Sequence, residues 1–88
     1  MAFRVTIRKK VEKGLSDLPE QVQRKFWVLV KELRLLGPIR GNWPNFSKLG
    51  NVTYHCHLGR NWVACWSREK ATIEIEVYYA GSREEAPY

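Results

Sequence analysis

The spacing of apolar residues changes about halfway along the chain, and this change most limits the possible folds. From Val22 to Leu36 apolar residues recur three and four positions apart, as on one face of an α-helix. From Val52 to Tyr79 apolar and polar residues alternate, which is typical of half-buried strands. A loop over 37–51, rich in Gly, Pro and Asn, separates the two patterns. A helical layer beside an antiparallel sheet is therefore expected, which is the α+β class.

The N-terminal segment adds one strand and one more helix. Residues 3–7 alternate apolar and polar, which predicts a short strand. Residues 8–15 carry two apolar residues four apart, which predicts a short helix. Pro19 suits the first turn of the next helix, because the first N–H of a helix has no partner, and Gly37 ends that helix. The expected order is β-α-α-β-β-β, an antiparallel sheet with a two-helix hairpin on one face, in a single domain spanning 1–88.

The length of one turn decides which side chains of the sheet are buried. Three consecutive strands are expected in the alternating half, at 52–58, 62–66 and 72–79. A three-residue turn at 59–61 would pair Leu58 with Trp62 and bury that indole. A two-residue turn would pair His57 with Trp62 and place the indole on the opposite face. We favour the three-residue turn because it buries more apolar surface.

One helical layer can cover only one face of a sheet, so we expect the other face to be open to solvent. His55 and His57 are two apart on a strand and therefore project from the same face, opposite Cys56. Because histidine titrates at a pKa of about 6.5, such a pair can supply one base and one acid. Ordinary polar surface is the competing interpretation of the pair. A metal site is not expected, because Cys56 points away and no Cys-x-x-Cys or His-Glu-x-x-His spacing occurs.

RNA cleavage by internal attack would use such a pair. One imidazole would take the proton of the 2′-hydroxyl, and the other would protonate the departing 5′-oxygen, which predicts a bell-shaped rate with both limbs near neutral pH. A cation must also hold the phosphate as negative charge builds on it. Arg60 and Arg83 are the candidates nearest in sequence.

Positive charge is concentrated in the first half of the chain. The net charge is +6, and residues 1–48 hold eleven Lys and Arg against four acids. A polyanionic partner fits this distribution, and so does a solvated surface on a helix pair. Among the aromatic residues, most are expected in the core. Trp43 and Tyr88 lie outside the periodic patterns and could stack on a nucleobase, although Tyr88 could also be a frayed end.

Targeting signals and cysteine usage point to the cytoplasm. No run approaches the roughly 18 apolar residues that a membrane span needs. The first residues interrupt their apolar stretch with an Arg and show no cleavage site, so no signal peptide is expected. Cys56 and Cys65 are then expected to be buried, reduced thiols rather than a disulfide.

Several motifs, in this order, resemble the RelE/ParE toxin superfamily over nearly the whole chain. They are Lys48-Leu49-Gly50 before the strands, Tyr54-His55-Cys56-His57-Leu58 on a strand, and Tyr79-Ala80-Gly81-Ser82-Arg83 leading to Tyr88. The resemblance is greatest to a branch with a Tyr-His-x-His strand, a Val-Ala-Cys-Trp strand and a Gly-x-x-Glu-x-Ala-Pro-Tyr ending. The resemblance implies the toxin of a type II toxin–antitoxin module, a metal-independent, ribosome-dependent mRNA endoribonuclease that needs no cofactor.

The resemblance also implies roles for particular residues. The implied catalytic residues are His55, His57, Arg83 and Tyr88. The candidate RNA-binding residues are Lys48, Arg60 and Trp43. Members of the family place an Arg on the strand expected at 62–66, where this chain has Trp62 or Val63, and Arg60 is the candidate to replace it.

Two other functions remain open on the same resemblance. ParE-like members inhibit DNA gyrase instead of cleaving mRNA, and a degenerate member would only bind its antitoxin. In each case a partner is implied. The basic helix pair should attract an acidic antitoxin segment, and the unpaired edges of the sheet can be covered by a partner strand. We expect a small adjacent gene to encode that antitoxin.

Overall fold

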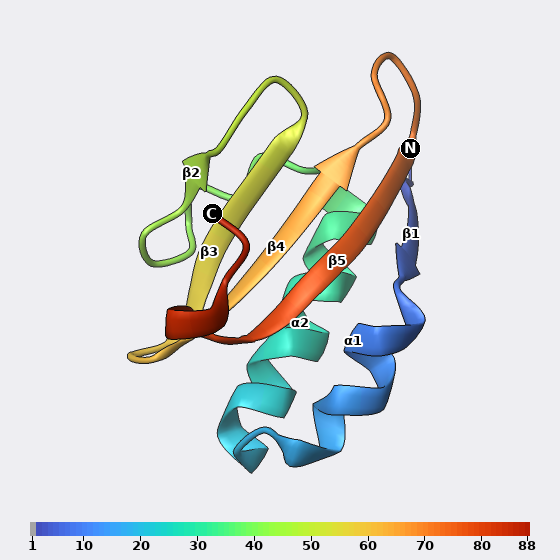
Figure 1. Ribbon diagram of the computed structural model, residues 1–88. Coiled ribbons are helices and arrows are strands. Elements are labelled where there is room, and N and C mark those ends of the chain that lie inside the picture. Colours follow the sequence, from blue (N-terminus) through green and yellow to red (C-terminus); the bar gives the residue numbers. More distant parts are fainter. Residues whose placement is uncertain (1) are drawn as a thin grey trace.

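The computed structural model describes residues 2–88. The elements follow in this order: β1 (Arg4–Ile7), α1 (Lys9–Gly14), the 3-10 helix η1 (Leu15–Asp17), α2 (Glu20–Leu36), β2 (Ser47–Lys48), β3 (Thr53–Gly59), β4 (Trp62–Arg68), β5 (Glu74–Ser82) and the 3-10 helix η2 (Arg83–Glu85). The α+β class and the β-α-α-β-β-β order are confirmed. Both helices lie on one face of the sheet (Figure 1).

The sheet differs from the expected one in two respects. Its strand order is β1-β5-β4-β3-β2, and β1 pairs parallel with β5, so the sheet is mixed rather than wholly antiparallel. Parallel neighbours need a long connection, and here the chain between β1 and β5 contains both helices and the strands β2, β3 and β4. The short strand β2 lies in the segment expected to be a loop and pairs with β3.

Helix α2 supplies most of the helical side of the core. It ends at Gly37, as expected, whereas Pro19, expected in its first turn, lies immediately before it. Gly37 has φ 94°, a conformation that glycine adopts without strain. Its inward stripe is Val22, Phe26, Leu29, Val30 and Leu33. Leu36, expected beside this stripe, is exposed. Trp27, expected in the core, is also about half exposed at 48%.

The β3–β4 hairpin has the favoured register over most of its length. Cys56 pairs with Ala64, and Tyr54 pairs with Trp66, so the three-residue interpretation is correct there. At the tip, Gly59 pairs with Trp62 and the register shifts between His57 and Gly59. The turn itself is therefore shorter than expected, and a bulge restores the pairing.

A second bulge, in β5, changes which side chains of this strand face the helices. Cys65 pairs with Tyr79 and Trp66 pairs with Val77, so one extra residue, Tyr78, is accommodated between them. Tyr79 consequently faces away from Ile75 and Val77. Strict alternation over the strand expected at 72–79 would put all three side chains on the same face, but the bulge interrupts this period of two.

The face without helices is less open than expected. After β5 the chain turns back across the sheet and ends beside β3 and β2 (Figure 1). Val63 and Cys65 lie on this face with no exposed surface, and His55 is only 8% exposed. The C-terminal segment therefore covers part of the surface on which a site was expected.

Candidate active site on β3

The two histidines lie together on the face that the C-terminal segment crosses. Their ring centroids are 5.7 Å apart, and Cys56 between them is in the core, so the predicted division of faces is confirmed. His55 is buried, whereas His57 is partly exposed. His57 is therefore the imidazole that a ligand reaches more easily.

His55 is held by contacts on two sides. Nδ1 of its ring is 2.9 Å from the hydroxyl oxygen of Ser47, which β2 places directly opposite on the sheet. The ring of Tyr88 packs against the other side, with centroids 4.6 Å apart. Tyr88 is thus ordered against a histidine rather than frayed, although its own side chain remains more than half exposed.

His57 is positioned by the loop before β2. Its backbone N–H donates to the carbonyl of Pro44 at 2.9 Å, which extends the pairing of β3 beyond β2. The amide nitrogen of Asn45 lies 3.3 Å from Nδ1 of the ring and donates to it, which leaves the proton of the neutral ring on Nε2. Asn45 adopts φ 53°, a left-handed conformation that asparagine tolerates better than most residues. No local sequence pattern marks Asn45, because its role depends on a loop contact.

Glu32 of α2 anchors this loop. One carboxylate oxygen accepts hydrogen bonds from Asn42 and from the indole N–H of Trp43, each at 2.9 Å, and from Arg40 at 3.3 Å. These bonds, led by that of Asn42, lower the pKa of Glu32. The anchor explains how a loop rich in Gly and Pro can hold Pro44 and Asn45 at a constant place beside His57.

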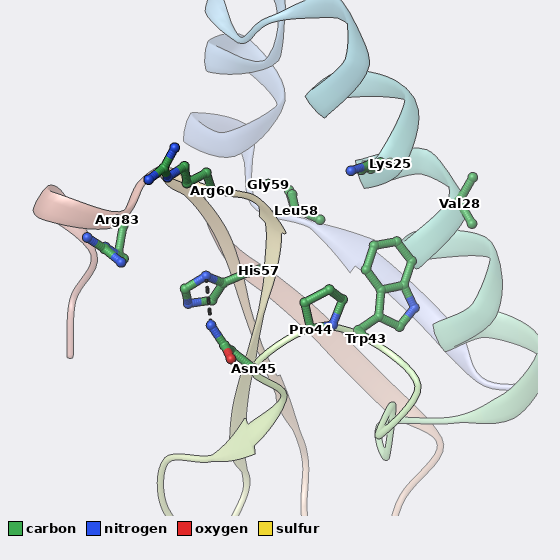
Figure 2. A pocket seen from close by; sticks show the side chains of 10 residues that line it. All are labelled: Lys25, Val28, Trp43, Pro44, Asn45, His57, Leu58, Gly59, Arg60 and Arg83. Atoms are coloured by element: carbon green, nitrogen blue, oxygen red, sulfur yellow. Dashed lines mark hydrogen bonds between the residues drawn. The ribbon is translucent and has the colours of Figure 1, made fainter.

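Two arginines stand beside His57. A pocket of about 590 Å³ is lined by His57, Arg60 and Arg83 together with other residues (Figure 2). Arg60 lies in the β3–β4 turn, and the backbone N–H of Arg83 donates to the carbonyl of Asn61 in the same turn at 2.8 Å. The sequence grouping of His57 with both arginines therefore corresponds to a grouping in space.

Other candidates lie elsewhere or differ in their setting. Lys48 is exposed. It pairs with Tyr54, whose side chain is in the core, so the Lys48 side chain leaves the sheet on the helix side, away from the histidines. Trp43 is partly buried and also lines the pocket. Neither Trp62 nor Val63, the two positions where the resemblance implies an Arg, supplies a cation, and Val63, which pairs with His57, is fully buried.

The surroundings of both imidazoles favour their neutral form. Burial, followed by the charge of His57, lowers the pKa of His55. Burial, followed by the charge of Arg83, lowers the pKa of His57. Both rings are therefore mainly neutral at pH 7. By contrast, burial raises the pKa of Cys56 and of Cys65 to about 12, so both remain protonated thiols.

These shifts can be measured directly. In an NMR titration we expect both histidine rings to titrate with midpoints below the ordinary value of about 6.5. The substitution Arg83→Gln should raise the midpoint of His57, because it removes the nearby positive charge, and should change that of His55 much less. A midpoint for His57 at or above 6.5 in the unsubstituted protein would contradict this description of the site.

Two features bear on cofactors and membranes. Over residues 2–88, no three His, Cys, Asp or Glu side chains come together in a group that could hold a metal ion. Within the same residues, no helix is both long and apolar enough to cross a bilayer.

Solved RelE toxins share this fold. The RelE–RelB complex of the archaeon Pyrococcus horikoshii OT3 contains a chain that is 26% identical, with 98% of this chain and all of that chain aligned at a TM-score of 0.81. The isolated Escherichia coli RelE toxin is 14% identical over 98% of this chain and 89% of its own, at a TM-score of 0.72. The RelBE2 toxin–antitoxin complex of Mycobacterium tuberculosis is 12% identical over 94% of this chain and all of its own, at 0.58.

The sequence comparisons add no nearer relative. No protein-family model matches the chain, and no curated protein does. The fold is that of the RelE toxins. That the Tyr-His-x-His strand and the Ala-Pro-Tyr ending place the chain in a particular branch stays a prediction.

Proposed function

We propose that this protein is the toxin of a type II toxin–antitoxin module and cleaves mRNA on the ribosome without a metal ion. The observation that carries the proposal is the pair of imidazoles 5.7 Å apart on the sheet face, with Arg83 and Arg60 in the pocket beside His57. The pair belongs to a fold that RelE toxins share. Two of these similar structures are toxin–antitoxin complexes, RelE–RelB and RelBE2.

The reaction needs only proton transfers and charge stabilisation. The 2′-oxygen bonds to phosphorus while the bond from phosphorus to the 5′-oxygen breaks, which gives a 2′,3′-cyclic phosphate and a 5′-hydroxyl. One imidazole takes the 2′-hydroxyl proton, and the other, as imidazolium, gives a proton to the 5′-oxygen. Arg83 and Arg60 are the groups that would stabilise the negative charge that builds on the phosphate oxygens.

Asn45 suits a histidine that changes its protonation state. Its amide nitrogen can donate to Nδ1 of the neutral ring, as in the structure. After a rotation of the amide, its oxygen can accept from Nδ1–H of the imidazolium. The sequence predicts a bell-shaped rate with both limbs near neutral pH. Because the pKa values of His55 and His57 are both lowered, we place the maximum of that rate on the acid side of neutrality.

Tyr88 links the tail to the reaction. It packs on His55, and its hydroxyl-bearing ring is the exposed aromatic surface closest to that imidazole. We propose that the base next to the scissile phosphate stacks on this ring, which would place the phosphate near His57.

An antitoxin would complete the module. The helix pair carries a dense set of basic residues, and these include Lys9, Lys10, Lys13, Arg24, Lys25, Lys31 and Arg34. Acidic residues in a partner segment would complement this surface. We propose that the antitoxin is such a segment, encoded beside this gene and ordered on binding.

Controlled expression in a bacterial host tests the proposal. We expect growth to stop with loss of protein synthesis and with cut messages, and co-expression of the adjacent small gene to restore growth and yield a stable complex. Arrest with a DNA-damage response and intact messages would instead indicate gyrase as the target. Unimpaired growth would indicate a non-catalytic member that only binds a partner.

A further inference from the structure

The pocket at the active site continues around the edge of the sheet to helix α2. On this edge β2 pairs with His55 and Tyr54, and the carbonyl of Pro44 accepts from the His57 N–H, so among the described residues only the end of β3 at Leu58 and Gly59 has no backbone partner beside it. The lining runs from Arg83 and His57, past this edge, to Lys25 and Val28 of α2 (Figure 2). A chain bound at His57 could therefore follow the groove from the sheet face toward the helices.

The groove is positively charged along its length. Lys25, Arg60 and Arg83 line it, and among residues 2–88 no carboxylate belongs to its lining. Within residues 2–88, none of these three cations forms an ion pair with an acid. By contrast, Arg8, Arg24 and Arg40 are each paired with a glutamate. Three cations without an acidic partner therefore line the groove, where they are available to an anionic ligand.

The middle of the groove offers a flat apolar wall. Trp43 lines it together with Pro44 and Leu58, and Val28 faces it from α2 (Figure 2). The bond from the indole N–H to Glu32, at 2.9 Å, holds the ring in place. A rigid indole is a suitable surface for a nucleobase, because every base presents a π-face and little side-chain freedom is lost on binding.

We infer that this groove binds a nucleotide flanking the scissile phosphate of single-stranded RNA. The base packs between Trp43 and Val28, and the adjoining phosphates lie along Arg60 and Lys25. The inference rests on the proposed function, since the RNA reaches the groove from His57. An acidic protein segment would match the cations, but it would not need the flat wall or the continuity with His57.

Two exposed apolar residues of α2 give a matched test. Val28 (51% exposed) lines the groove, whereas Leu35 (56% exposed) does not. Val28→Glu and Leu35→Glu add the same charge to the same helix. The probe is a fluorescein-labelled 2′-O-methyl hexaribonucleotide, which cannot be cleaved because its 2′-oxygens are blocked, and binding is followed by fluorescence anisotropy at low salt. We expect Val28→Glu to weaken binding about tenfold and Leu35→Glu less than about twofold.

The outcomes separate the groove from the reaction. Equal effects of the two substitutions would overturn the inference. So would an unsubstituted protein that cleaves ribosome-bound mRNA but fails to bind the probe, and in that case the proposed function would stand. Loss of antitoxin binding by Val28→Glu, with unchanged probe binding, would show a protein-docking surface instead. If Val28→Glu weakens probe binding but the unsubstituted protein cleaves no RNA, the inferred nucleotide site is supported and the proposed function is wrong.

Discussion

Replacing His57 by alanine should lower the rate of ribosome-dependent RNA cleavage by about a hundredfold to ten-thousandfold, the usual contribution of a general acid or base. His57 is the more exposed of the two imidazoles and lies in the pocket with Arg60 and Arg83. His55→Ala should reduce the rate as well, and the double substitution should not multiply the two losses, because the imidazoles act as a unit.

The controls must separate chemistry from folding. Thr53 lies on β3, on the face of the two histidines but at the other end of the strand, so Thr53→Ala is a matched substitution that should keep near-normal activity. Thermal unfolding of each variant shows whether the buried His55 is also needed for stability. If the double variant His55→Ala/His57→Ala degrades RNA as fast as the unsubstituted protein, these imidazoles are not the catalysts.

The largest loss of stability is expected from Trp66→Ala. The Trp66 side chain is fully buried, stacks with Tyr54 and Phe46, and donates its indole N–H to the carbonyl of Pro38 at 3.1 Å. Truncation leaves a large cavity and an unpaired carbonyl, so we expect the free energy of unfolding to fall by about 3–5 kcal/mol. That is a large share of the roughly 5–15 kcal/mol that stabilises a typical domain.

A second tryptophan supplies the comparison. Trp27 is 48% exposed on α2 and contacts the ring of Phe26 edge-on, at 5.1 Å between centroids. Trp27→Ala should therefore cost no more than about 1 kcal/mol in urea unfolding. Equal losses for the two substitutions would contradict the distinction between a core and a surface tryptophan, which composition alone could not make.

The site was predictable in part. Alternation along β3 correctly placed His55 and His57 together and Cys56 in the core. The position of Arg60 in the turn that directly follows β3 was enough to associate it with the histidines. Asn45 and Glu32 gave no such signal, because their contacts depend on how the 37–46 loop folds against α2 and β3. Lys48 was placed with the site by motif order, but its pairing partner on β3 faces the helices.

Local sequence patterns were enough to predict the main helices and strands and the inner faces of α2, β3 and β4. Helical spacing in 22–33 and alternation in 53–66 are local patterns, and burial of apolar surface is strong enough to impose them on the fold. Long-range contacts set the remaining features, which are the parallel pairing of β1, the bulges at the hairpin tip and in β5, and the tail that buries His55. Each of these depends on residues far apart in the chain. Their energies come from contacts that exist only once the sheet, the loop and the tail have come together, so no local spacing encodes them.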